Sequence, residues 1–231
     1  MSSITDNIRS VTRRIQKATL TAGRADGSVR LLAVSKTRPA ADVRQAAATG
    51  QLAFGENYVQ EALDKMQELT DLPELEWHFI GPIQSNKTRA IAGHFHWVHS
   101  VDRLKIARRL SEQRPSTLPP LNVCLQVNIN QEDSKSGCLP DEVVVLATEV
   151  SKLPGLTLRG LMAIPDPHQS EAQLRASFAR LAALLAELRQ VPAVADTVDT
   201  LSMGMSADLE LAIAEGATIV RVGTDLFGAR N

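Results

Sequence analysis

Leu31-Leu32-Ala33-Val34-Ser35-Lys36 is an apolar run of strand length, and it is the first of eight such runs that alternate with helical patterns. The other seven lie at 53–57, 76–81, 96–101, 122–129, 157–164, 200–204 and 218–223. Strands that alternate with helices pair in parallel through right-handed crossovers, and eight repeats predict a (β/α)8 TIM barrel of class α/β. A doubly wound open sheet is the alternative, but no GxGxxG follows the first strand, where a dinucleotide-binding fold places its phosphate turn.

An extra helix is expected before the first strand. Ile4, Ile8, Val11, Ile15 and Ala18 recur at steps of four and three, which is typical of an amphipathic helix docked on a core.

Polar residues mark the ends of several later helices. Ser170 and Gln173 form a capping box, and Asp102 is expected to cap the helix that follows it. Ser206 is expected to begin a further helix, and Gly216 to end it.

Composition excludes several classes of protein. The chain has 231 residues, 25 Lys and Arg against 26 Asp and Glu, and 44% apolar residues, which describes one soluble globular domain over 1–231. It lacks both the basic excess of a nucleic-acid-binding protein and the long apolar stretch of a membrane helix. The absence of an apolar leader and the two widely spaced cysteines, Cys124 and Cys138, favour the cytoplasm. The even charge favours a monomer and leaves a weak dimer open.

Active sites of such barrels lie at the carboxyl ends of the strands, where this sequence places unusual residues. Lys36 shares the strand face of Leu32 and Val34, so an amine ends an apolar face. Burial favours the neutral amine, which condenses with carbonyl groups. A lysine at the rim that extends its amine into solvent satisfies the same pattern, and both interpretations stay open. At the end of the second run, Asn57 offers a donor and an acceptor.

The last two runs predict a phosphate site. Barrels commonly bind phosphate with the loops that follow strands seven and eight. The segments 202–206 and 222–225 supply glycine for close backbone approach and hydroxyl groups for hydrogen bonds. Asp225 would repel an anion and is expected to point away. Lys135, in the polar loop 131–137, is a second candidate amine.

Arg221 lies on the strand face of Ile219 and Gly223, and a guanidinium inside a barrel needs an acceptor. Glu56 is one candidate, and a heteroatom of a cofactor is the other. His78, between bulky apolar residues, is expected to be a core histidine. No metal site is expected from the histidines at 94, 96 and 99, because the third falls on the opposite strand face.

Seven segments together resemble the pyridoxal phosphate homeostasis proteins of the YggS/PROSC family. They are LAVSKT (32–37), FGENY (54–58), WHFIGPIQSNK (77–87), SKSG (134–137), GLMAI (160–164), LSMGMS (201–206) and RVGTDLFGAR (221–230). The resemblance spans nearly the whole chain. It implies a barrel similar to the N-terminal domain of alanine racemase and other fold-type III proteins, with pyridoxal 5′-phosphate (PLP) bound at its mouth.

The resemblance also assigns roles to individual residues. It implies that Lys36 forms the internal aldimine, that Asn57 lines the cofactor ring, that Arg221 faces the pyridine nitrogen, and that the phosphate is held by Ser202, Gly223 and Thr224. An arginine leaves the pyridine nitrogen unprotonated, which makes the ring a poorer electron sink.

The family is regarded as non-enzymatic, so the resemblance implies a role in holding PLP and in intracellular vitamin B6 balance. Transfer of PLP to apo-enzymes, with Lys87 and Lys135 as secondary acceptors, is a further hypothesis. A PLP-dependent racemase or lyase is an alternative, but it needs a second acid/base, and Tyr58 is the only tyrosine. A Schiff-base aldolase for a sugar phosphate is the other alternative, although its lysine usually lies on a later strand.

Overall fold

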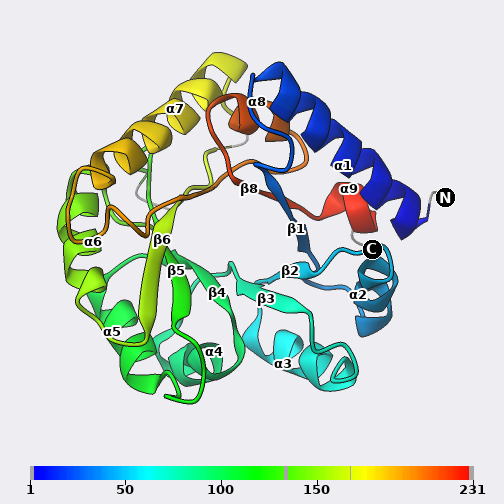
Figure 1. Ribbon diagram of the computed structural model, residues 1–231, viewed down its shortest axis with the longest axis horizontal. Coiled ribbons are helices and arrows are strands. Elements are labelled where there is room, and N and C mark those ends of the chain that lie inside the picture. The colour runs from blue at the N-terminus through cyan, green and yellow to red at the C-terminus, as the bar shows by residue number, and fades with distance from the viewer. Residues whose placement is uncertain (1–2, 133–134, 167, 229–231) are drawn as a thin grey trace.

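The computed structural model describes residues 3–132, 135–166 and 168–228, and within them the strands close into a parallel barrel (Figure 1). The strands are β1 (Arg30–Val34), β2 (Ala53–Glu56), β3 (Glu76–Phe79), β4 (Trp97–Val101), β5 (Leu121–Gln126), β6 (Leu156–Met162), β7 (Thr200–Ser202) and β8 (Ile219–Val222). Each strand pairs with its neighbour in sequence, and β8 pairs with β1. This closure confirms the TIM barrel and excludes the open sheet.

Helices form a ring outside the strands (Figure 1). They are α1 (Ile4–Thr21), α2 (Ala40–Ala47), α3 (Val59–Glu68), α4 (Thr88–His94), α5 (Leu104–Gln113), α6 (Val143–Ser151), α7 (Glu171–Leu188), α8 (Leu209–Ala214) and α9 (Thr224–Phe227), with short 3-10 turns η1 (Ser85–Lys87) and η2 (Pro140–Glu142). No helix in the described part of the chain is both long enough and apolar enough to cross a membrane.

The expected extra helix is confirmed. α1 lies beside α8 and α9 and also contacts α2 (Figure 1). Ile8, Val11 and Ile15 are buried on one face, as the spacing predicts. The Ser3 hydroxyl accepts a hydrogen bond from the Asp6 amide and caps the first turn.

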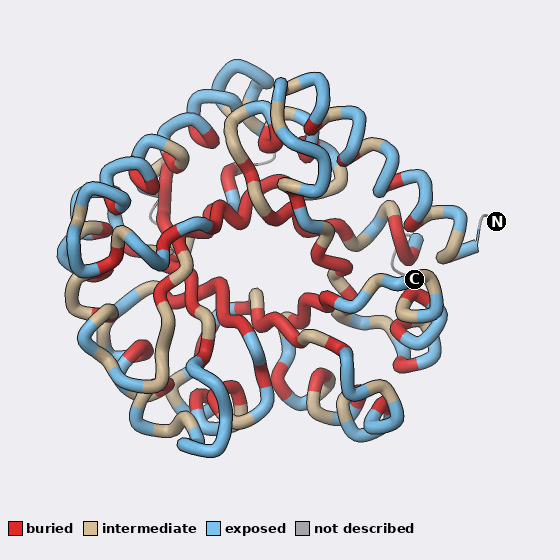
Figure 2. Tube along the Cα trace, in the orientation of Figure 1, coloured by how far each residue is buried: buried red, intermediate tan, exposed pale blue. Residues whose placement is uncertain are grey.

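The core has two parts. A continuous apolar layer lies between the strands and the helix ring, where the buried sides of the helices face inward (Figure 2). Two smaller clusters are separate from it: one contains Leu32 and Ile219, and the other contains Trp97, Cys124 and Met162. Leu32 lies on the strand face opposite to Ala33, which belongs to the outer layer, so these clusters fill the barrel interior.

Two of the predicted helix starts are wrong. α5 begins after Arg103 without a side-chain cap, because the carboxylate of Asp102 pairs with the Arg103 guanidinium instead. α8 begins after Asp208, and Ser206 lies in the preceding loop. The capping box of Ser170 and Gln173 is confirmed at the start of α7.

Candidate functional site

The carboxyl ends of β8, β1 and β2 meet at one edge of the barrel mouth. Ala33 pairs with Val222, and Val34 pairs with Gly55. The residues that follow these strands therefore lie side by side: Gly223 and Thr224 after β8, Lys36 after β1, and Asn57 after β2. The approach is close, because a Cβ on Gly223 would lie 3.2 Å from the carbonyl oxygen of Val34. Four of the six predicted site residues are thus neighbours along the rim.

Lys36 is half-buried, and the residue before it is held by groups on the helix side of the barrel. Ser35 Oγ donates to Glu56 Oε1 at 2.6 Å, and the Ser35 carbonyl accepts from Lys65 Nζ at 2.6 Å. Lys65 Nζ also lies 2.7 Å from Glu56 Oε1. Burial raises the pKa of the Glu56 carboxyl, against the opposing effect of Lys65. Glu56 therefore pairs with Lys65, and the suggested pairing of Glu56 with Arg221 is wrong.

The residue after Lys36 is held by the same groups. Thr37 has a φ of 63°, in the left-handed region that β-branched residues disfavour. Its amide donates to Glu61 Oε1 at 2.5 Å, and Lys65 Nζ lies 2.6 Å from the same oxygen. We refer to Ser35, Thr37, Glu56, Glu61 and Lys65 as the outer cluster. It fixes the backbone on both sides of Lys36.

Asn57 presents an unsatisfied polar atom at the mouth. Its Oδ1 is buried and has no hydrogen-bond partner among the described residues. Its backbone is packed against the loop that follows β3, since a Cβ on Gly81 would lie 2.3 Å from the Asn57 carbonyl oxygen. A buried acceptor without a partner costs free energy unless a ligand or water satisfies it.

Arg221 lies inside the barrel and is held by acceptors of β7 and the segment after β6. Nη1 donates to the carbonyl oxygen of Ser202 at 2.5 Å and to its Oγ at 2.8 Å, and Nη2 donates to the Ala163 carbonyl at 3.0 Å. Within residues 3–132, 135–166 and 168–228, the side chain makes no further hydrogen bond, so Nε–H has no acceptor there. Burial lowers the pKa of the guanidinium to about 10, a value at which it stays charged at neutral pH.

Ser202 is fully buried, unlike the other residues predicted to hold the phosphate. Its Oγ lies between Arg221 Nη1 and His99 Nδ1, which is 2.8 Å away. In this structure the hydroxyl therefore already has protein partners. A phosphate contact of Ser202 stays a prediction that would require those partners to move.

The two candidate phosphate loops are braced from outside by α1. Arg14 lies 2.6 Å from Asp225 and 2.8 Å from Glu210, and it also donates to the carbonyl of Ser206 at 3.0 Å. The Asp225 carboxylate is thus paired with a cation of α1. Gly204 has a φ of 91°, and a Cβ there would lie 2.6 Å from the Cβ of Ala212, so this loop requires glycine.

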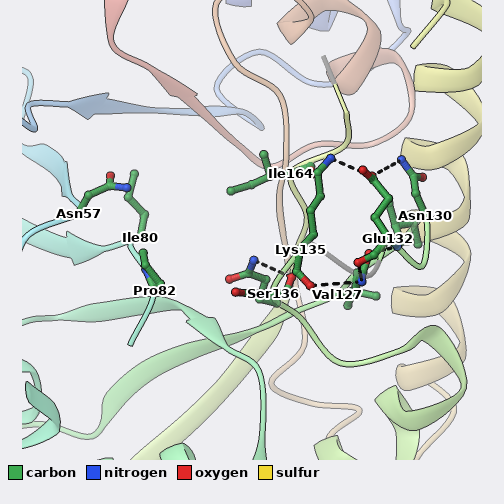
Figure 3. A pocket seen from close by; sticks show the side chains of 12 residues that line it. Asn57, Ile80, Pro82, Val127, Asn130, Glu132, Lys135, Ser136 and Ile164 are labelled. Carbon is green, nitrogen blue, oxygen red and sulfur yellow. Dashed lines mark hydrogen bonds and ion pairs between the residues drawn. The ribbon is translucent and has the colours of Figure 1, made fainter. Parts of the chain in front are cut away.

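A cavity of about 270 Å³ opens at the mouth beside Asn57. Asn57, Ile80 and Pro82 approach it from one side, and Lys135 and Ser136 from the other (Figure 3). Of the predicted cofactor-binding residues, Asn57 is the one that lines this cavity, and strand register places Lys36 next to it. Lys135 lies 2.8 Å from Glu132. The predicted loop 131–137 contains Asp133 and Ser134, which lie outside the described residues, as do the last residues of the 221–230 motif.

The three histidines at 94, 96 and 99 lie in different surroundings and do not share a contact. His94 bonds to the Ala90 carbonyl, His96 accepts from the Trp77 amide, and His99 lies inside the barrel. The described residues contain no group of three or more His, Cys, Asp or Glu side chains suited to a metal ion. Cys124 and Cys138 are both buried and free.

Sequence reasoning missed Lys65 entirely. One signal was available, because Lys65 follows Glu61 by four residues and so lies on the same face of a helix. The sequence suggests Glu56 only as a candidate partner of Arg221. Its partner could not be identified, since the contact depends on how α3 packs against β1 and β2.

Comparisons with known proteins show which sequences and folds this chain is similar to. The family model of the alanine racemase N-terminal domain matches residues 2–231. A curated protein of Pseudomonas aeruginosa, named pyridoxal phosphate homeostasis protein, is 64% identical over 231 residues, which cover 100% of this chain and 97% of that protein.

Solved structures of other proteins have a similar fold. PipY of Synechococcus elongatus PCC7942, solved with PLP bound, is 41% identical with a TM-score of 0.85, over 98% of this chain and 100% of PipY. Alanine racemase from Corynebacterium glutamicum is 16% identical with a TM-score of 0.70, over 98% of this chain and 62% of the racemase. The racemase supports the fold alone.

Proposed function

We propose, from the premise that this chain belongs to the alanine racemase N-terminal domain family and within it to the pyridoxal phosphate homeostasis proteins, that it binds PLP at the barrel mouth and takes part in PLP homeostasis. The observation that carries the proposal is the placement of Lys36 on the rim between Asn57 and Gly223, with Arg221 buried nearby in the adjacent strand. Lys36 offers an amine to the aldehyde of PLP, Asn57 offers an amide to the oxygen on its ring, and Arg221 offers a charged donor to its ring nitrogen.

The residues present fit the cofactor. Lys36 would hold the cofactor through its amine, because an amine condenses with an aldehyde and releases water. Asn57 Oδ1, buried without a partner among the described residues, gains a ligand contact. Arg221, whose Nε–H has no acceptor among the described residues, would face the pyridine nitrogen. Gly223 and Thr224, directly after β8, would hold the phosphate, and Ser202 accepts a hydrogen bond from Arg221.

We further propose that the protein holds PLP without strong catalysis of its own. PLP supplies an electron sink when bound, and the strength of that sink depends on protonation of its pyridine nitrogen. Arg221 carries no proton that it can give up at neutral pH, so it leaves that nitrogen unprotonated. Racemisation also needs a second acid/base above the substrate. Tyr58, the only tyrosine, is 56% exposed at the start of α3 and does not line the cavity.

Absorbance spectroscopy tests this proposal. The wild-type protein and Lys36→Ala are each mixed with PLP and then with a panel of amino acids, with Lys135→Ala as a matched control at the same mouth. We expect a visible band that is lost in Lys36→Ala, persists in Lys135→Ala, and changes no amino acid into product. Product formation would make the protein an enzyme, and no band in the wild type would favour the sugar-phosphate aldolase.

A role in handing PLP to apo-enzymes of the cytoplasm completes the proposal. Lys135 lines the mouth cavity, whereas Lys87 is exposed on η1 and does not. We expect Lys135→Ala to slow PLP release to an acceptor enzyme and Lys87→Ala to leave it unchanged. Equal release by all three proteins would dismiss both lysines.

Size-exclusion chromatography tests the expected monomer.

A further inference from the structure

A second set of polar residues crosses the barrel interior, four of them buried and Glu76 partly exposed, and PLP binding at the mouth does not by itself account for it. His99 Nδ1 lies 2.8 Å from Ser202 Oγ, and His99 Nε2 lies 2.9 Å from His78 Nδ1. His78 Nε2 lies 2.7 Å from Glu76 Oε1. Together with the contact from Arg221 Nη1 to Ser202, these bonds form an unbroken series. We refer to Arg221, Ser202, His99, His78 and Glu76 as the inner chain.

The two ends of the inner chain have opposite hydrogen-bonding character. Glu76 is the first residue of β3 and therefore lies at the opposite mouth from Lys36, where Arg30 donates to both of its carboxylate oxygens at 3.0 and 2.8 Å. Burial raises the pKa of Glu76, but the bonds from His78 and Arg30 outweigh it and hold that pKa below its usual range. Glu76 is thus an ionised acceptor, whereas Arg221 can only donate.

The two histidines between these ends are neutral. Both are fully buried, and Trp97 stacks on the His78 ring with the ring centres 5.4 Å apart. Burial lowers the pKa of His78 to about 4, against the opposing effect of Glu76, and it lowers the pKa of His99 well below its usual value. Each ring therefore carries a single N–H at neutral pH.

Only one direction of donation satisfies every contact. An ionised Glu76 requires the His78 proton on Nε2, so His78 Nδ1 accepts from His99 Nε2–H. His99 Nδ1 then accepts from the Ser202 hydroxyl, whose lone pairs remain for Arg221. The reverse direction would place two acceptors 2.7 Å apart at Glu76 and His78. Each bond polarises the next, so the Ser202 oxygen becomes a better acceptor for the Arg221 guanidinium.

We infer that Glu76, at the mouth opposite to the cofactor, is a positioning residue that orients the inner chain and thereby fixes Arg221 for the pyridine nitrogen. The inference rests on the proposed function for its effect on PLP. The direction of hydrogen-bond donation along the inner chain is a property of the protein without cofactor. Glu76 does not touch the cofactor and acts through His78, His99 and Ser202.

The first experiment uses the ligand-free protein labelled with ¹⁵N-histidine. Long-range ¹H–¹⁵N correlation at pH 7 reports which ring nitrogen carries the proton. We expect His78 and His99 to be protonated on Nε2 in the wild type and in Glu76→Asp, which retains the carboxylate. In Glu76→Gln the amide can donate to His78 Nε2, so we expect protonation to move toward Nδ1 in both rings.

The second experiment measures PLP binding by the same variants. We expect Glu76→Gln to weaken binding about threefold to tenfold, the effect of one hydrogen bond, and to shift the visible band of the Lys36-bound cofactor. Glu76→Asp should leave both the affinity for PLP and the position of the visible band close to those of the wild type. Asp199→Asn is the matched control, because Asp199 pairs with Arg159 next to the amino end of β7 and makes no bond to the inner chain. Thermal unfolding of each variant separates these effects from loss of fold.

The two experiments separate failure of the inference from failure of the proposed function. Protonation on Nδ1 in the wild type overturns the inference, as does a Glu76→Gln variant that binds PLP like Asp199→Asn. A wild type that gives no visible band with PLP contradicts the proposed function. The protonated nitrogens of His78 and His99 still report the direction of donation in the inner chain, because that experiment uses no PLP.

Discussion

The outer cluster holds the backbone beside Lys36, and the inner chain holds Arg221, and the two do so by different means. The outer cluster brings Lys65 into direct contact with the carboxylates of Glu56 and Glu61, at 2.7 and 2.6 Å. The inner chain separates its charged ends, Arg221 and Glu76, by two neutral rings and a hydroxyl. Direct ion pairs hold a stretch of backbone in place. The neutral series holds the Arg221 guanidinium, which contacts no carboxylate in the part of the chain that the structure describes.

The largest expected effect comes from breaking the ion pairs of the outer cluster. Lys65→Met leaves Glu56 buried without its cation, and we expect the free energy of unfolding to fall by about 3–5 kcal/mol. Denaturant titration measures this change. Adding Glu56→Gln to the same protein removes the uncompensated charge and should recover most of the loss. A loss below about 1 kcal/mol in the single variant would show that solvent already screens the pair.

Acid distinguishes the two regions. Unfolded histidine binds a proton near its ordinary pKa of 6.5, whereas folded His78 binds one only near 4. Between these values the unfolded chain holds more protons, so stability is complete above pH 6.5 and falls as the pH decreases toward 4. We expect His78 alone to cost about 2 kcal/mol between pH 7 and 5, and His99 to add to it.

The outer cluster should respond to acid in the opposite sense. The raised pKa of Glu56 means that protonation favours the folded state, so this group contributes stability at low pH that is lost as the pH rises through its folded pKa. Denaturant unfolding at several pH values measures how the free energy of unfolding depends on pH. His78→Gln has no titrating ring at this position, so its comparison with the wild type isolates the contribution of His78. Equal slopes for His78→Gln and the wild type would contradict the assignment to the inner chain.

The smallest expected effect concerns the strained residue of the outer cluster. Thr37 is exposed and has a φ of 63°, and asparagine adopts this conformation more readily than a β-branched residue. We expect Thr37→Asn to raise the free energy of unfolding by about 1 kcal/mol and to leave the band of the Lys36-bound cofactor unchanged. If Thr37→Asn destabilises the protein, the hydroxyl of Thr37 has a role that the strain argument does not include.

Strand positions could be predicted closely, whereas the ends of the strands could not. The predicted strands 31–36, 53–57 and 76–81 end in the structure at Val34, Glu56 and Phe79. The residues beyond these ends leave the sheet at the mouth, and they include Lys36 and Asn57. An apolar run predicts burial, but it does not show where a neighbouring strand stops offering hydrogen bonds.

The sequence alone determined the barrel, its extra helix, and the inward face of Arg221, because strand and helix periodicities are local properties of the chain. It also brought out Lys36 and the loops at Gly204 and Gly223 as candidates. Only the tertiary structure decided that Glu56 pairs with Lys65, that Ser202 supports Arg221, and that His78 and His99 connect Arg221 to Glu76. These partners lie on different strands and helices, and closure of the barrel sets the distances between them.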